Sequence, residues 1–177
     1  MSESVQPLSP ARIELISNWP EVLKPWSIPK AGAKVHALLL SSEAGMTAEE
    51  IVLSLGLSTG SVSEQLRFLV ESGLLDRVKI LGKRRIIFHA VQDPARIFLA
   101  LAAIRRNAVS TPIQYMSESL ASIANKEDAR WLTAISQMQA LSRLMDDWLR
   151  VCSTRDPEWT ANWIQKGIHS SISKLNA

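Results

Sequence analysis

The sequence predicts a mainly α-helical fold in which two short helices are followed by a β-hairpin and then by long helices. Between 46 and 73, two stretches with apolar residues at helical spacing are joined by a short turn that contains Gly56. From 74 to 91, two apolar and β-branched runs flank a turn at 81–83. Two helices joined by a turn and followed by a hairpin form a winged helix-turn-helix, in which the hairpin is the wing.

The first helix of the pair is defined by its two ends. Thr47 and Glu50 form a capping box, in which the Thr47 side chain accepts from the Glu50 N–H and the Glu50 carboxylate bonds back. Gly56 ends the helix in a conformation that most other residues resist. The apolar residues expected to be buried are Ile51, Val52 and Leu55.

The second helix is predicted over 58–72, with Ser58 as its N-cap and Gly73 after its end. Its apolar face is expected to lie in the core and consists of Val62, Leu66, Leu69 and Val70. The residues opposite that face are Gly60, Ser61, Ser63, Glu64, Arg67 and Phe68.

Positive charge is concentrated in the hairpin. Its cations are Arg77, Lys79, Lys83, Arg84 and Arg85, all within nine positions, with Asp76 as the acid nearby. Residues 1–93 hold ten Lys and Arg against ten Asp and Glu, so this half of the chain is neutral overall. The net charge of the whole chain, +3, is too small for a general polyanion binder. A cationic hairpin can instead follow DNA phosphates while the second helix enters the major groove.

The polar side of the second helix suits contact with DNA. Small side chains near its start let the backbone approach a duplex, and its first N–H groups suit a phosphate. Arg67 can contact guanine or the backbone, and Glu64 can accept from cytosine N4, although a carboxylate usually repels the duplex. The alternative for this face is ordinary solvation. The candidate DNA contacts are Ser58, Thr59, Gly60, Ser61, Ser63, Glu64, Gln65 (at the boundary of the apolar face), Arg67, Arg77, Lys79, Lys83, Arg84 and Arg85.

Three runs carry a resemblance to a known family: WSIPKAGAK from Trp26, STGSVSEQLRFLVESGLL from Ser58 and VKILGKRR from Val78. They resemble the glycine-betaine-synthesis repressor (GbsR) family, a branch of the multiple-antibiotic-resistance-regulator (MarR) type of winged-helix transcription factors. The stronger part of the match covers roughly 26–94. The resemblance implies a DNA-binding regulator with a C-terminal dimerisation region, and some members of that family sense choline-like osmolyte precursors.

The segment before the helix pair is predicted to be helical but interrupted. Ser9 and Pro10 begin a short amphipathic helix, and prolines at 20, 25 and 29 are expected to divide the stretch that follows. A helix over 30–41 then precedes the helix-turn-helix. These patterns predict three segments: 1–28 as an N-terminal helix and connection, 29–93 as the winged helix-turn-helix, and 94–177 as a helical region for dimerisation and effector binding.

Long helices dominate the C-terminal region. Helix is predicted over 96–108, with a break or kink at Thr111-Pro112, and again over 113–124. The helix over 129–152 has a seam at alternating spacings of four and three, formed by Ala134, Met138, Leu141, Met145, Trp148 and Cys152. A last helix is expected after Asp156-Pro157.

These helices have more apolar surface than a lone winged helix of this size needs. Packing within one chain is one explanation and a dimer interface is the other. DNA geometry favours the dimer, because one recognition helix covers only a half-site and a two-fold dimer covers a palindrome. The candidate interface residues are Met138, Leu141, Met145, Trp148, Trp159 and Trp163.

Six tryptophans are many for 177 residues. Aromatic faces attract quaternary ammonium ions, and the resemblance implies such effectors for some family members. The candidate effector-binding rings are Trp19, Trp26 and Trp131, whereas core and interface packing is the alternative for all of them.

Other chemistry is not supported. The run at 56–60 matches the G-x-S-x-G nucleophile motif, but a capped helix precedes it where that motif needs a strand. His36, His89 and His169 lack metal-ligand spacing, so no metal or cofactor is predicted. A single cysteine, Cys152, cannot form an intrachain disulfide, which favours a reducing cytoplasm. The longest apolar run, 97–104, is far too short to span a membrane.

The sequence therefore predicts a non-enzymatic, cytoplasmic protein that binds double-stranded DNA as a homodimer and regulates transcription, with repression as the expected direction. A small-molecule effector is part of this hypothesis. The alternative from another class is a winged helix used only for protein–protein assembly, with the wing charges serving a partner surface.

Overall fold

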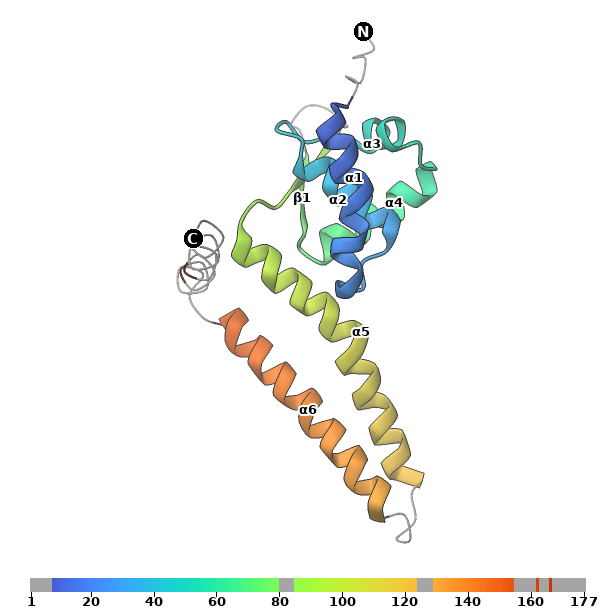
Figure 1. Cartoon of the computed structure of the whole chain (residues 1–177), viewed down its shortest axis with the longest axis vertical. Coiled ribbons are helices and arrows are strands. Elements are labelled where there is room, and N and C mark those ends of the chain that lie inside the picture. The colour runs from blue at the N-terminus through green and yellow to red at the C-terminus, as the bar shows by residue number, and fades with distance from the viewer. Residues whose placement is uncertain (1–7, 80–84, 124–128, 155–161, 163–165, 167–177) are drawn as a thin grey trace, which may run out of the picture. The chain divides into compact units, whose positions relative to one another are not determined.

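The computed structural model describes residues 8–79, 85–123, 129–154, 162 and 166. The chain divides into two compact units, Met1–Leu101 and Ala102–Ala177, and the long helix α5 (Pro94–Ile123) continues from one into the other (Figure 1). Within the described ranges, no helix combines the length and the apolar character that crossing a membrane requires.

The first unit contains the predicted winged helix-turn-helix. Its elements in chain order are α1 (Pro10–Leu23), the 3-10 helix η1 (Lys24–Trp26), α2 (Lys30–Leu40), α3 (Ala48–Leu55), α4 (Thr59–Glu71), β1 (Leu75–Lys79) and β2 (Ile86–Ala90), before α5 begins. Helices α3 and α4 are the helix-turn-helix pair, and β1 pairs with β2 in an antiparallel hairpin. The predicted fold class is confirmed. The predicted turn at 81–83 lies outside the described residues.

The sequence signals at the helix ends are confirmed. The Thr47 capping box is complete, and the Ser58 side chain accepts a hydrogen bond from the Ser61 N–H at 3.2 Å. Gly56 and Gly73 have φ angles of 62° and 81°, so both adopt the left-handed conformation that ends a helix and favours glycine.

The core of the first unit is built around α2, which packs against α1 and α4. The buried side chains of α2 include Val35, Leu38 and Leu39. They meet the buried faces of the two helix-turn-helix helices, where Ile51, Val62 and Leu69 have no exposed surface. The pair α3–α4 is therefore held to α2 through apolar contacts on its inner side.

At two positions a proline does not interrupt its helix, contrary to the prediction. Pro20 does not interrupt α1, which continues to Leu23, and its ring is buried beside Ile16. Because proline has no N–H, the helix loses one backbone bond at this point, and burial of the apolar side of α1 offsets that loss. Pro112 likewise lies inside α5, so the helix is not broken there. The other two prolines do lie at boundaries between elements: Pro25 is in η1, directly after α1, and Pro29 is the N-cap of α2.

The second unit contains the later part of α5 and α6 (Ala129–Thr154), joined by polar contacts. The Ser142 hydroxyl donates to the Ser110 carbonyl at 3.4 Å, and the Gln114 side-chain amide donates to Asp146 at 2.8 Å. Among the side chains of α6 that the structure describes, Ile135 and Ser142 are buried. The helix predicted after Pro157, with Trp159 and Trp163, lies outside the described residues.

His36 is a buried titratable group of the first unit, with 1% of its surface exposed. Its Nδ1 accepts a hydrogen bond from the Trp19 indole N–H at 3.0 Å, and the two rings are stacked with centroids 6.1 Å apart. Desolvation by burial lowers the pKa of His36 from 6.5 to about 4. The imidazole is therefore neutral in the folded protein at physiological pH.

We expect the free energy of unfolding to decrease as the pH falls from about 6.5 to about 4, because the unfolded chain binds a proton at His36 that the folded chain does not. At pH 5 the loss should be about 2 kcal/mol relative to pH 7.5. Urea denaturation at both pH values measures it. The His36→Gln variant should lose this pH dependence and the control His89→Gln should keep it. The same dependence in all three proteins would contradict the assignment.

Candidate nucleic-acid interface

Helix α4 has two opposite faces with different surroundings. Val62, Leu66 and Leu69 are buried in the core of the first unit. On the other side, a stripe of residues four positions apart is exposed and consists of Thr59, Ser63, Arg67 and Glu71. Because the buried residues fix how the helix is rotated, this stripe lies on the outer surface of the helix-turn-helix.

A hollow of about 490 Å³ lies between α4 and the hairpin. Its lining includes the whole exposed stripe of α4, and Arg77 of β1 and Phe88 of β2 belong to the same lining. The remaining lining residues are Ala48, Leu66 and Val70. The recognition helix and the first strand of the wing therefore form one concave surface. Two guanidinium groups, those of Arg67 and Arg77, belong to it.

Asp76, the acid next to the wing cations in the sequence, is paired with a residue of another element. Asp76 accepts hydrogen bonds from both terminal nitrogens of Arg96 at the start of α5, at 2.9 and 3.3 Å. The hydrogen bond and the charge of Asp76 raise the pKa of Arg96. Because Asp76 is offset by Arg96, it does not neutralise Arg77 and Lys79. These two exposed cations share one face of β1, since alternate residues of a strand point the same way.

Gln65 does not belong to the exposed face, contrary to its place among the predicted DNA contacts. Its side chain is 7% exposed, and its Oε1 has no hydrogen-bond partner. This oxygen lies against Gly32 of α2, where an added Cβ would be only 2.8 Å away. Helical spacing placed Gln65 at the boundary, and the close approach of α2 at a glycine draws it into the core.

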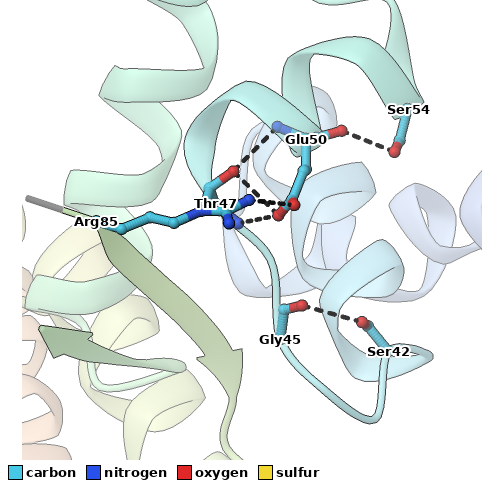
Figure 2. A network of polar contacts seen from close by, with 6 residues as sticks. All are labelled: Ser42, Gly45, Thr47, Glu50, Ser54 and Arg85. Atoms are coloured by element: carbon cyan, nitrogen blue, oxygen red, sulfur yellow. Dashed lines mark hydrogen bonds and ion pairs between the residues drawn. The ribbon is translucent and has the colours of Figure 1, made fainter. Parts of the chain in front are cut away.

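The predicted wing cations differ in their surroundings. Arg85, just before β2, forms an ion pair with Glu50 of α3 at 2.8 Å (Figure 2). Lys83 and Arg84 lie outside the described residues. Sequence reasoning treated Glu50 only as part of a capping box and missed its link to the wing. No local pattern signals a contact between residues 35 positions apart.

The candidate effector rings have different environments. Trp19 is engaged with His36 through its N–H and its ring face, which favours the packing alternative for this residue. Trp26 lies half-buried in η1, and Trp131 is exposed on α6. An effector role for Trp26 and Trp131 stays a prediction.

The predicted dimer residues on α6 lie mainly on its exposed side. Met138, Leu141 and Trp148 are exposed, whereas Met145 is half-buried and its sulfur lies 3.8 Å from the Ser110 hydroxyl. The sequence seam thus differs from the face that packs within the unit, which carries Ile135 and Ser142. Leu144, with 66% exposure, belongs to the same apolar surface and was not predicted.

Comparison with known proteins agrees with this geometry. Residues 35–77 match a family described as bacterial regulatory protein, arsR family. This stretch runs from α2 to β1 and includes the helix-turn-helix. The transcriptional regulator AdcR of Streptococcus pneumoniae serotype 2 is 34% identical over 61 residues, which cover 34% of this chain and 42% of that protein. The chain therefore matches less than half the length of this curated relative.

A solved crystal structure of a transcriptional regulator is similar over a longer range. It covers 82% of this chain and 100% of its own, with a TM-score of 0.59 and 20% sequence identity. At this identity the likeness shows the fold, which is that of a winged helix-turn-helix protein with additional helices. The glycine-betaine-synthesis repressor branch is not among these matches and stays a prediction.

Proposed function

We propose that this protein is a sequence-specific DNA-binding transcriptional regulator that acts in the cytoplasm as a homodimer, with repression as its direction. One observation carries the proposal: the exposed stripe of α4 and Arg77, on the cationic face of β1, line the same concave surface. In such an arrangement α4 enters the major groove and the wing follows the adjacent phosphates.

The start of α4 supports a close approach to a duplex. An added Cβ at Gly60 would meet no other atom within 4 Å, so the packing of this chain does not require a glycine there. Glycine near a helix start lowers helix stability, and its benefit here is room for the DNA backbone. The Ser61 N–H is bonded to the Ser58 side chain, but the N–H groups of Thr59 and Gly60 before it have no partner within the helix and are suited to a phosphate.

The proposed contacts follow from chemistry and placement. Arg67 is suited to a guanine edge, and Ser61 and Ser63 to base or phosphate oxygens. Glu64 is suited to the amino group of cytosine. Arg77 and Lys79 are suited to phosphates and contribute to binding at every sequence.

The apolar surface of α6 supports the homodimer. Its exposed members are Met138, Leu141, Leu144, Trp148 and Val151. They recur at spacings of three and four along the helix, as in a helix that packs against another helix. A two-fold dimer also supplies the second recognition helix that a palindromic site needs. A quaternary ammonium effector near Trp26 or Trp131 remains part of the proposal.

Arg77→Ala should weaken binding to all DNA sequences and reduce the slope of log K against log salt concentration by about 0.9, because one phosphate contact is lost. Fluorescence anisotropy between 50 and 200 mM KCl measures the slope, with a duplex selected from a random pool and with random DNA. The control Lys24→Ala removes an exposed cation of η1 and should change neither quantity. An unchanged slope for the Arg77 variant would count against the wing contact.

Arg67→Ala should reduce sequence preference. We expect a roughly tenfold to hundredfold loss on the selected duplex and a smaller loss on random DNA, because a base contact contributes only at the correct base. Competition binding measures both affinities. An equal loss on the two DNAs would contradict base recognition by this residue.

Leu141→Asp combined with Leu144→Asp should convert a dimer into a monomer at micromolar concentration, because two charged groups would have to be buried in the interface. Analytical ultracentrifugation measures the mass. Leu53→Asp is the matched control, since Leu53 is 71% exposed but belongs to α3. A native protein that sediments as a monomer, or a variant that remains dimeric, would contradict the proposed interface.

A further inference from the structure

The carboxylate of Glu50 has two different sets of partners (Figure 2). Its Oε2 accepts from the Thr47 N–H at 2.7 Å and from the Thr47 hydroxyl at 3.0 Å. Its Oε1 accepts from Nη2 of Arg85 at 2.8 Å. A capping box needs only one carboxylate oxygen, so the second oxygen is available for a partner outside the helix.

The partner lies at the base of the wing. Arg85 directly precedes β2, next to the pair formed by Ile86 and Lys79. Farther along β2, Phe88 exchanges two backbone hydrogen bonds with Met46, at 2.9 and 3.0 Å. The segment before α3 thus holds the middle of β2 through its backbone. The Glu50 side chain extends this attachment to the end of β2 that lies nearer the wing tip.

The ion pair is favoured because the capping box already holds the Glu50 side chain in one conformation. The side chain of Glu50 is 28% exposed and that of Arg85 is 46% exposed, so the pair is only partly screened by water. An exposed pair normally has to order two long side chains. Here the cap has already fixed the carboxylate, so only the Arg85 side chain loses freedom.

We propose that Glu50 is a positioning residue for the wing: through Arg85 it holds the base of the hairpin against the N-terminus of α3. It thereby sets where Arg77 and Lys79 are presented beside α4. Arg85 acts through this pair and is not a phosphate ligand. The inference rests on the proposed DNA binding for its effect on affinity, but its effect on the hairpin does not depend on DNA.

The proposal predicts that loss of an acidic residue weakens DNA binding, which is the opposite of the usual effect. Removing an acidic residue from a DNA-binding unit normally strengthens binding, because repulsion with phosphates is relieved. Glu50→Gln should instead weaken binding, by roughly two- to fivefold, because the wing loses an ion pair while glutamine can still serve the capping box.

The matched control is Glu49→Gln. Glu49 is exposed on the same first turn of α3, so this variant removes the same charge without touching the pair. Anisotropy with the selected duplex should show equal or tighter binding for Glu49→Gln and weaker binding for Glu50→Gln. Tighter binding by Glu50→Gln would overturn the proposal, because it would show that the pair keeps Arg85 from DNA.

Arg85→Ala separates positioning from phosphate binding. The proposal predicts weaker binding with an unchanged salt slope, and no further loss when Arg85→Ala is added to Glu50→Gln. A slope reduced by about 0.9 together with additive losses would overturn it in favour of a direct phosphate contact.

A measurement without DNA tests the same proposal independently. Amide hydrogen exchange of β2 should be faster in Glu50→Gln than in the native protein, and unchanged in Glu49→Gln. Equal exchange in all three proteins would overturn the inference. If the native protein fails to bind any duplex, the proposed function is wrong, and the exchange experiment alone then decides about Glu50.

Discussion

The burial of three side chains, Val62, Leu66 and Leu69, fixes the rotation of α4 about its own axis. Everything proposed for the surface depends on that constraint. A helix has 3.6 residues per turn, so the residues on the other side of α4 from these three must face outward. Gly32 adds to the constraint, because the missing side chain lets α4 approach α2 closely at Gln65. The outward stripe is thus determined from inside the unit.

The charges around the hairpin are arranged by contacts that cross between elements. Asp76 is paired with Arg96 of α5, and Glu50 is paired with Arg85. Asp76 and Glu50 thus each have a cation as partner, while Arg77 and Lys79 remain exposed on β1. A chain half that is neutral by count can in this way present a positive surface beside α4. The same acids stabilise the positions of the elements that carry this surface.

The sequence predicts local features well and contacts between distant residues poorly. The capping box of Thr47, the N-cap of Ser58 and the end at Gly56 follow from short-range backbone chemistry, and all are confirmed. Gln65 was misplaced because its burial depends on a glycine in another helix. Arg85 was assigned to DNA alone because its partner is far away in the sequence. The prediction that Pro20 interrupts its helix was wrong, because burial of the apolar side of α1 outweighs one lost backbone hydrogen bond.

The central claim is that α4 and β1 present one continuous surface to a duplex. The most direct measurement is the change in backbone amide NMR signals of the full-length, isotopically labelled protein when a selected duplex is added. We expect the largest changes at Thr59, Ser63 and Arg67 on α4 and at Arg77 and Lys79 on β1. Changes confined to other elements, with these five signals unmoved by saturating DNA, would contradict a single DNA-binding surface formed by α4 and β1.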